Sequence, residues 1–428
     1  MTEKNVTRRS CLRAAGLGAA TFALSGCLGS NGGDNGGETE ADYSTSGKMP
    51  WMDKESSPVV APDESEILYE PSSWEEENSE TINHMTWAGY EVEEVQSPIE
   101  DTFNMESNVE LHLSDTEVFN RFESGEWSDW HHVTVDNAWL PRFAEAGLVR
   151  PMDYETWEPY IFDPLLDAFH PDNSDFKFTF VNEEDWTFDQ DGQLYGFPQR
   201  FGYFGIIANR DTVGDAEIAD QGYDVAYSDQ YDVVLNGGSF FFNMIAVMQR
   251  EGINPFKSHS EQEIQDIREA GLALAENASV LDSYPSVAQS MSAGEFDIAI
   301  GFPNLVANII RNEGAMNFRT YVPQAVDGVK QGVIWVETTA FVKGNHPRIS
   351  DNYAAMMMSP DVAYKLSVQT PVTVPHAGVR EKYSENTKNV LDLEYLDTAL
   401  ERSVFYEGLF DEKEMMSIWR EMQSAAGS

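Results

Sequence analysis

The feature that most constrains the fold is a regular alternation of strand-like and helix-like segments that begins at Thr81. β-Branched and aromatic runs indicate strands, and amphipathic runs between them indicate helices. Such alternation is typical of an α/β fold, with a mostly parallel sheet and helices on both faces. The first series has predicted strands at 81–87, 109–113 and 131–135 and predicted helices at 91–105, 116–124 and 138–146.

A second series of the same kind follows, and a final strand at 333–342 returns after a long excursion. Its predicted strands are 204–209, 231–235 and 296–301, and its predicted helices are 240–250, 261–276 and 287–293. Ser260 and Glu263 form a capping-box pattern at the start of the second helix. We therefore predict two α/β lobes joined by crossing strands, with lobe 1 at 81–203 and 335–370 and lobe 2 at 204–334 and 371–425.

The first 27 residues are typical of an export signal. Residues 7–13 (TRRSCLR) form a twin-arginine pattern, and the apolar stretch 14–24 is too short for a membrane span of about 20 residues. Leu24-Ser25-Gly26-Cys27 matches a lipobox, in which the cysteine becomes the lipidated first residue. We expect a twin-arginine lipoprotein signal over 1–27 and a protein anchored by a lipid on Cys27 to the outer face of the cell membrane.

Residues 28–80 are rich in Gly, Ser, Asn, Glu and Asp and predict a flexible acidic tether. The only other cysteine is Cys11, which lies in the signal, so the mature chain cannot form a disulfide. The fold must therefore be stabilised by burial of its core.

The formal net charge of −46 excludes nucleic acid as a partner. The acids are spread evenly, which favours adaptation to molar salt over an electrostatic trap for cations. At 1 M salt the Debye length is about 3 Å, so distributed surface charge would not steer a ligand. Ligand preference must come from local residues.

Glu337 is the one carboxylate in the strand-like run 333–342 (VIWVETTAFV). By the two-residue period of a strand it shares a face with Trp335, and an aromatic ring beside a carboxylate can bind a cation. The alternative is that Glu337 lies at a solvated strand edge or pairs with Arg200 or Lys343.

Three segments resemble those of the solute-binding proteins of ABC importers. Residues 191–198 (DGQLYGFP) look like the turn before the first lobe crossing, 291–302 (MSAGEFDIAIGF) like a helix–strand unit of the second lobe, and 358–363 (MSPDVA) like a helix start. Within this superfamily the chain is most similar to the spermidine/putrescine-binding proteins, over about residues 81–385. The resemblance implies a two-lobed periplasmic-binding-protein fold of type II, a ligand cleft between the lobes, and no enzymatic activity.

The same resemblance suggests site residues. Trp87 and Tyr90 match an aromatic pair that lines the polyamine channel, Phe302 matches a Trp of the second lobe, and Trp335 and Glu337 match a Trp-x-Asp whose carboxylate binds a ligand ammonium. The alternative for the aromatic residues is simple core packing.

The chain also departs from the family's pattern. The family has an acid where this chain has Gly89, and two more acids where Gly238 and Phe240 stand. Phe240 opens a helix after a Gly-Gly turn, and a bare helix N-terminus there could attract an anion. Asn137 and Trp139 occupy the turn equivalent to that of Trp87.

The remaining motifs give little evidence of function. His131 and His132 point to opposite faces of a strand, which disfavours a shared metal ion, and Asn277 opens a glycosylation sequon. No nucleophile elbow, zinc-protease or phosphate-loop motif is present.

We therefore predict a solute-binding lipoprotein of an ABC importer that captures a small polar or cationic, polyamine-like solute by hinge closure. Its partners would be the solute, a membrane permease and the membrane itself, and we expect a monomer without cofactor or metal. Alternatives are another solute (anionic or zwitterionic, a sugar, chelated iron), service to a chemoreceptor, or a tethered extracellular hydrolase. The predicted ligand-binding residues are Trp87, Tyr90, Asn137, Trp139, Phe240, Phe302, Trp335 and Glu337.

Overall fold

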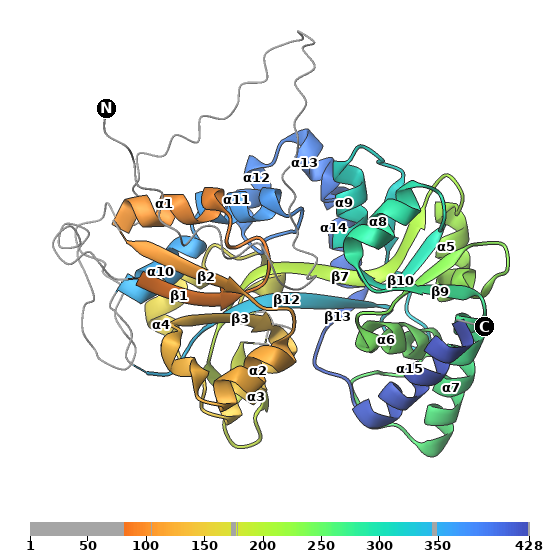
Figure 1. Ribbon diagram of the computed structural model, residues 1–428, viewed down its shortest axis with the longest axis horizontal. Coiled ribbons are helices and arrows are strands. Elements are labelled where there is room, and N and C mark those ends of the chain that lie inside the picture. Colours follow the sequence, from red (N-terminus) through yellow and green to blue (C-terminus); the bar gives the residue numbers. More distant parts are fainter. Residues whose placement is uncertain (1–80, 104, 173–176, 178, 345–348, 427–428) are drawn as a thin grey trace, which may run out of the picture. The chain divides into compact units, whose positions relative to one another are not determined.

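The computed structural model describes residues 81–426, with gaps at 104, 173–176, 178 and 345–348 (Figure 1). The predicted signal, the lipobox with Cys27 and the predicted tether lie outside the described residues.

The fold is built on a ten-stranded sheet, with a small three-stranded sheet beside it. The large sheet has the order β2-β1-β3-β12-β7-β10-β8-β9, with β11 paired to β7 and β13 to β12. Its strands are β1 (Thr81–Thr86), β2 (Glu106–Leu111), β3 (His132–Asp136), β7 (Phe197–Asn209), β8 (Val233–Asn236), β9 (Ala278–Leu281), β10 (Ile298–Pro303), β11 (Phe318–Tyr321), β12 (Gly332–Phe341) and β13 (Ser403–Phe405). The small sheet has β4 (Phe180–Asn182), β5 (Thr187–Phe188) and β6 (Gln193–Leu194).

Two long antiparallel strands, β7 and β12, connect the two halves of the large sheet (Figure 1). On one side β12 pairs with β3, which continues through the parallel strands β1 and β2. On the other side β7 pairs with β10 and β11, and β10 continues through the parallel strands β8 and β9. The sheet is thus mixed, because each lobe is parallel while the connecting strands run antiparallel.

Helices cover both lobes (Figure 1). Around β1–β3 they are α1 (Glu93–Phe103), α2 (Asp115–Glu123), α3 (Leu140–Glu145), α4 (Tyr154–Trp157), α10 (Ile349–Met357) and α11 (Pro360–Gln369). Around β8–β10 they are α5 (Asp215–Gln221), α6 (Phe240–Arg250), α7 (Glu261–Glu276), α8 (Tyr284–Ser292), α9 (Leu305–Asn312) and α15 (Glu412–Ala426). Three more, α12 (Ala377–Lys382), α13 (Glu385–Val390) and α14 (Leu393–Glu401), link the groups, since α12 packs on α11 and α13 on α9.

Most predicted elements are confirmed within a few residues. Helices α6 and α7 have the predicted bounds, and Ser260 and Glu263 form the full capping box at the start of α7. The largest difference is β7, which begins at Phe197 instead of 204. Pro198 hides this strand in the sequence; the structure tolerates it because Pro198 lies beside a β-bulge in the pairing with β12.

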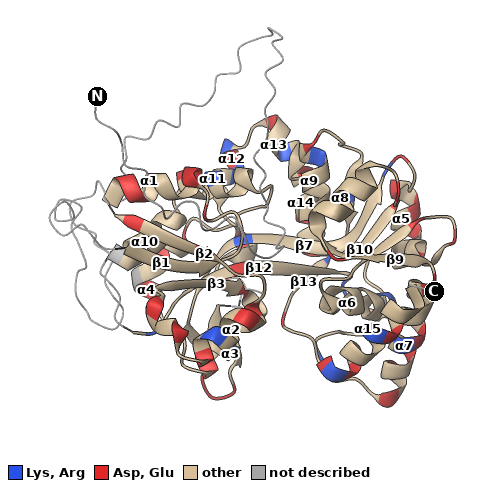
Figure 2. Cartoon of the chain, in the orientation of Figure 1, with Lys and Arg blue, Asp and Glu red and all other residues tan. Residues whose placement is uncertain are grey.

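Apolar side chains fill the space between the sheet and its helices, and every residue of β12 is buried. Asp and Glu, by contrast, are distributed over the helices and loops of both lobes (Figure 2). Within the described part of the chain, no helix combines the length and apolar character needed to cross a membrane.

Candidate functional site

Glu337 lies on β12 directly opposite Arg200 on β7. The two side chains form a bidentate ion pair: Arg200 Nε donates to Glu337 Oε2 over 2.6 Å and Nη2 donates to Oε1 over 2.8 Å. The side chains are 4% and 10% exposed. Burial opposes the charge of Arg200, but Glu337 raises the Arg200 pKa above its ordinary value. Arg200 is thus one of the two partners that the sequence analysis gave as alternatives for Glu337.

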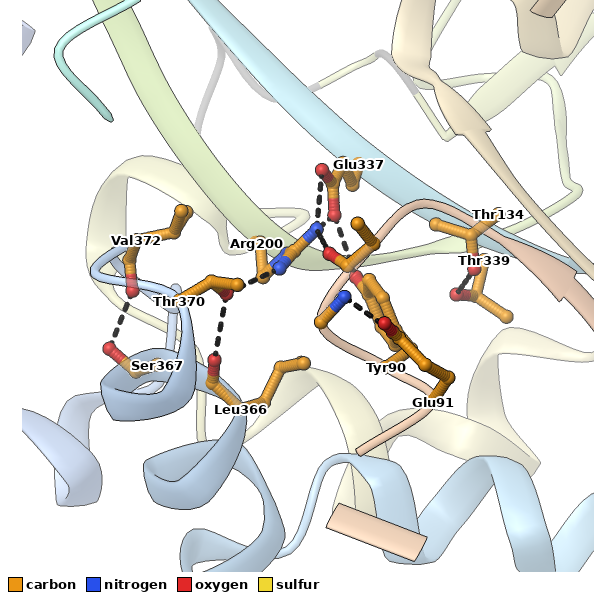
Figure 3. Close-up of polar contacts among 12 residues, drawn as sticks. Tyr90, Glu91, Thr134, Arg200, Glu337, Thr339, Leu366, Ser367, Thr370 and Val372 are labelled. Atoms are coloured by element: carbon orange, nitrogen blue, oxygen red, sulfur yellow. Dashed lines mark hydrogen bonds and ion pairs between the residues drawn. The ribbon is translucent and has the colours of Figure 1, made fainter. Parts of the chain in front are cut away.

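Arg200 also contacts two other segments of the chain (Figure 3). Its Nη2 donates to the Ala88 carbonyl over 2.9 Å, and its Nη1 donates to the Thr370 hydroxyl over 2.7 Å. Its guanidinium lies 4.5 Å from the centre of the Tyr90 ring. Ala88 and Tyr90 follow β1, and Thr370 ends α11, so one side chain connects both long strands to two loops.

The predicted pair Trp87 and Tyr90 divides between two environments. Tyr90 is fully buried, and its hydroxyl donates to Glu337 Oε2 over 2.9 Å. Burial and the Glu337 carboxylate raise the pKa of Tyr90 well above its ordinary value. Trp87 is half-buried and its ring lies 4.3 Å from that of His112. Its Nε1 is shielded from solvent and has no hydrogen-bond partner among the described residues.

Sequence reasoning missed two acids at the same edge of the sheet, Asp115 and Asp136. Asp136 ends β3, opposite Glu337, and Asp115 is the first residue of α2, just after β2. The Asp136 backbone N–H donates to Asp115 Oδ1 over 3.1 Å. Asp136 Oδ1 is shielded from solvent and has no partner within the described part of the chain. The signal that could have found them is their position, because parallel α/β sheets bind ligands at the carboxyl ends of strands.

These two acids carry perturbed pKa values. Burial, with a smaller contribution from Glu337, raises the pKa of Asp115 to about 7. Burial, Asp115 and Glu337 together raise the pKa of Asp136 well above its ordinary value. Carboxyls that are shielded from solvent and lie next to one another resist ionisation, so the pair tends to hold a proton near neutral pH. A positive group placed beside them would displace that proton.

Two tyrosines from other parts of the fold interact electrostatically with the acids. Asp136 helps raise the pKa of Tyr284, at the start of α8, to about 12, although burial is the larger cause. Both acids likewise raise the pKa of the buried Tyr406, again behind burial itself. Tyr284 packs with the half of the sheet that contains β8–β10, so Asp136 interacts electrostatically with a residue of that half.

Asn137 and Trp139 lie close by. Both ends of the Asn137 amide are used internally: Nδ2 donates to the Tyr406 carbonyl over 2.6 Å, and Oδ1 accepts from the Val336 N–H over 3.2 Å. Trp139 is half-buried, with the Arg142 guanidinium 4.5 Å from its ring centre.

The other three predicted residues are largely in the core. Phe302 is fully buried, with its ring 6.0 Å from that of Tyr284. Phe240 is 8% exposed and stacks on Phe241. Trp335 is 7% exposed, and its Nε1 has no partner among the residues that the structure describes. The geometry thus brings Tyr90 and Glu337 into contact, while the ligand-binding role of all eight residues stays a prediction.

The described residues contain no group of three or more His, Cys, Asp or Glu side chains that could hold a metal ion.

Comparison with known proteins gives a result for structure only. No family model and no curated protein matches the sequence. Among solved structures, the spermidine/putrescine ABC transporter substrate-binding protein of Streptococcus pneumoniae matches with a TM-score of 0.62 and 13% identity, covering 81% of this chain and 99% of that one. A lipoprotein of Treponema pallidum matches with a TM-score of 0.60 and 15% identity, covering 81% and 100%. The chain has the fold of ABC-transporter substrate-binding proteins.

That fold serves more than one ligand. A periplasmic binding protein of Agrobacterium tumefaciens, solved with glucopine, matches with a TM-score of 0.54 and 15% identity, covering 81% of this chain and 98% of that one. The substrate-binding-protein fold predicted from the sequence is therefore confirmed.

Proposed function

We propose that the chain is the solute-binding protein of an ABC importer and that it captures a small cationic solute between its lobes. The observation that supports this most directly is a pair of acids at the carboxyl ends of β2 and β3: Asp115, which is buried, and Asp136, which is half-buried with its Oδ1 shielded from solvent. Asp136 Oδ1 has no partner within the described part of the chain. A buried carboxylate oxygen without a partner is costly, and an ammonium group would satisfy it. The fold supports the same class, since its neighbours include spermidine/putrescine-binding proteins.

The solute would be held by charge and aromatic surface together. Trp87 and Trp139 lie next to the strand ends that bear the acids and keep part of their surface exposed, so we assign them as aromatic walls. Binding would favour closure of the lobes about the two connecting strands, β7 and β12, and the closed form would be presented to the permease.

A zwitterionic solute is the second candidate. Helix α6 begins after Ser239, whose side chain makes no capping hydrogen bond. The first N–H groups of α6 therefore favour a negative group, as the sequence suggested for Phe240. A solute with an amine and a carboxylate would use both the acids and this helix end.

The context of the chain is part of the proposal. We propose export by the twin-arginine route, a lipid anchor on Cys27, a monomeric state and adaptation to high salt. The even distribution of acids in Figure 2 supports the last point. The twin-arginine pattern supports the export route, and the lipobox supports the lipid anchor.

A thermal-shift screen in molar salt tests the function. The compounds are polyamines, amino acids, sugars and phosphonates, each followed by mass analysis of the compound after incubation. We expect an amine to raise the melting temperature and remain chemically intact. Stabilisation only by sugars or phosphonates would refute the cationic solute, and turnover of any compound would favour the tethered hydrolase.

A further inference from the structure

The guanidinium of Arg200 occupies a site whose walls all favour a positive charge (Figure 3). The walls are the Glu337 carboxylate, the Ala88 carbonyl, the Thr370 hydroxyl and the face of the Tyr90 ring. Four hydrogen bonds use most of the five N–H donors of the guanidinium. A carboxylate, a carbonyl, a hydroxyl and an aromatic face are the groups that bind organic cations in proteins.

The residues that form these walls lie on other segments of the chain than Arg200. Glu337 is on β12, Ala88 and Tyr90 follow β1, and Thr370 ends α11, whereas Arg200 is on β7. Removing the guanidinium alone would leave a buried negative charge and two oxygen acceptors without their partner. The site would then accept a free cation of the same shape.

Gly89 shows how closely the guanidinium fills this space. A Cβ at position 89 would lie 2.8 Å from Arg200 Nη1 and 2.7 Å from Thr370 Cγ2. The backbone there also has a φ of +103°, which side chains rarely adopt. No acidic side chain can enter at position 89 while Arg200 is in place.

We propose that Glu337, Tyr90, Ala88 and Thr370 form a cation-binding site that the chain fills with its own Arg200. The built-in cation joins four segments and makes Glu337 unavailable to an amine of the solute. Arg200 is then a specificity-determining residue: it leaves Asp115 and Asp136 as the acids that face a solute. Only this last consequence rests on the proposed function.

The test is chemical rescue of Arg200→Ala in the solute-free protein. Ethylguanidinium replaces the atoms that the substitution removes, and ethylammonium provides the same charge without the planar fork. We expect Arg200→Ala to melt below the wild type and to regain stability along a saturable curve with ethylguanidinium. Ethylammonium should give a smaller rise, and the wild type should not respond. Ionic strength is held constant throughout.

Two further variants make the result specific. Arg200→Ala/Glu337→Gln should melt above Arg200→Ala, because the unpaired charge is gone, and should lose the ethylguanidinium response. Arg380→Ala is the matched control, since Arg380 pairs with Asp397 at the surface, with side chains 34% and 74% exposed. It should melt near the wild type without rescue.

A response that is equal in Arg200→Ala and the double variant would overturn the proposal, as would Arg200→Ala melting like the wild type. If Arg200→Ala does not fold alone, the yield of folded protein is measured after refolding with and without ethylguanidinium. An unchanged yield would argue against the site. Failure of the importer proposal would appear separately, as a wild type that binds no solute.

Discussion

Binding of an amine should depend on pH through Asp115 and Asp136. The pKa of Asp115 is raised to about 7, so the acid is about 3% ionised at pH 5.5 and about 97% at pH 8.5. An amine with a lysine-like pKa of about 10.4 stays charged over this range. Titration of Asp115 alone should therefore raise the affinity about 30-fold from pH 5.5 to pH 8.5, or about 2 kcal/mol. Asp136, whose pKa is also raised, should add to this rise.

The sign follows from proton linkage. The folded protein holds a proton on Asp115 that the unfolded chain has lost above pH ~4, so the free protein loses stability as pH rises from ~4 to ~7. A bound cation releases the proton and offsets that loss. An amine should thus raise the melting temperature more at pH 8 than at pH 5.5.

Isothermal titration calorimetry with putrescine, or with the amine selected by the screen, measures this directly. Titrations in buffers of different ionisation enthalpy count the protons released at each pH. Asp115→Asn should reduce the pH dependence, leaving the part due to Asp136. Asp136→Asn should weaken binding by about 2–5 kcal/mol. Asp397→Asn, at an exposed acid, is the control. Equal affinity at both pH values with no proton release would refute the role of the pair.

Three further predictions concern stability. Asp392 is buried between Arg311 and Arg319, and Asp392→Ala should cost about 3–5 kcal/mol in denaturant unfolding because it leaves two guanidinium groups unpaired. Burial lowers the pKa of His112 to about 4, so between pH 6.5 and 4 the unfolded chain binds a proton that the folded chain does not. The free energy of unfolding should therefore fall by up to ~3 kcal/mol as pH falls through that range. His112→Gln should remove this part of the pH dependence of stability. Gly202→Ala should cost about 1–3 kcal/mol, measured by melting, because its Cβ would overlap neighbouring side chains.

The sequence predicted the elements well where local signals decide them. The capping box of α7 and the amphipathic pattern of α6 depend on residues a few positions apart. The alternation of elements predicted two α/β lobes joined by crossing strands, and the resemblance then identified the type of two-lobed fold.

The site was harder to predict because its contacts are long-range. Arg200 and Glu337 are 137 positions apart, and their pairing depends on the register of two strands, one of which Pro198 disguises. Asp115 and Asp136 did not stand out because the chain has 73 acidic residues. Only the structure distinguishes the buried Asp115 and the half-buried Asp136 from the many acids that face solvent.

The β-bulge in the pairing of β7 with β12 has a mechanical consequence. The register shifts between Glu337 and Thr338, immediately beside the Arg200 ion pair. A bulge bends and twists a strand, so we expect the proposed closure to bend the two connecting strands at this position. Residues close to such a bend move little relative to one another, whereas residues far from it move more. We therefore expect the contacts of Arg200 to stay intact during opening and closing. They should fix the position at which β7 and β12 bend, but not the angle of the bend.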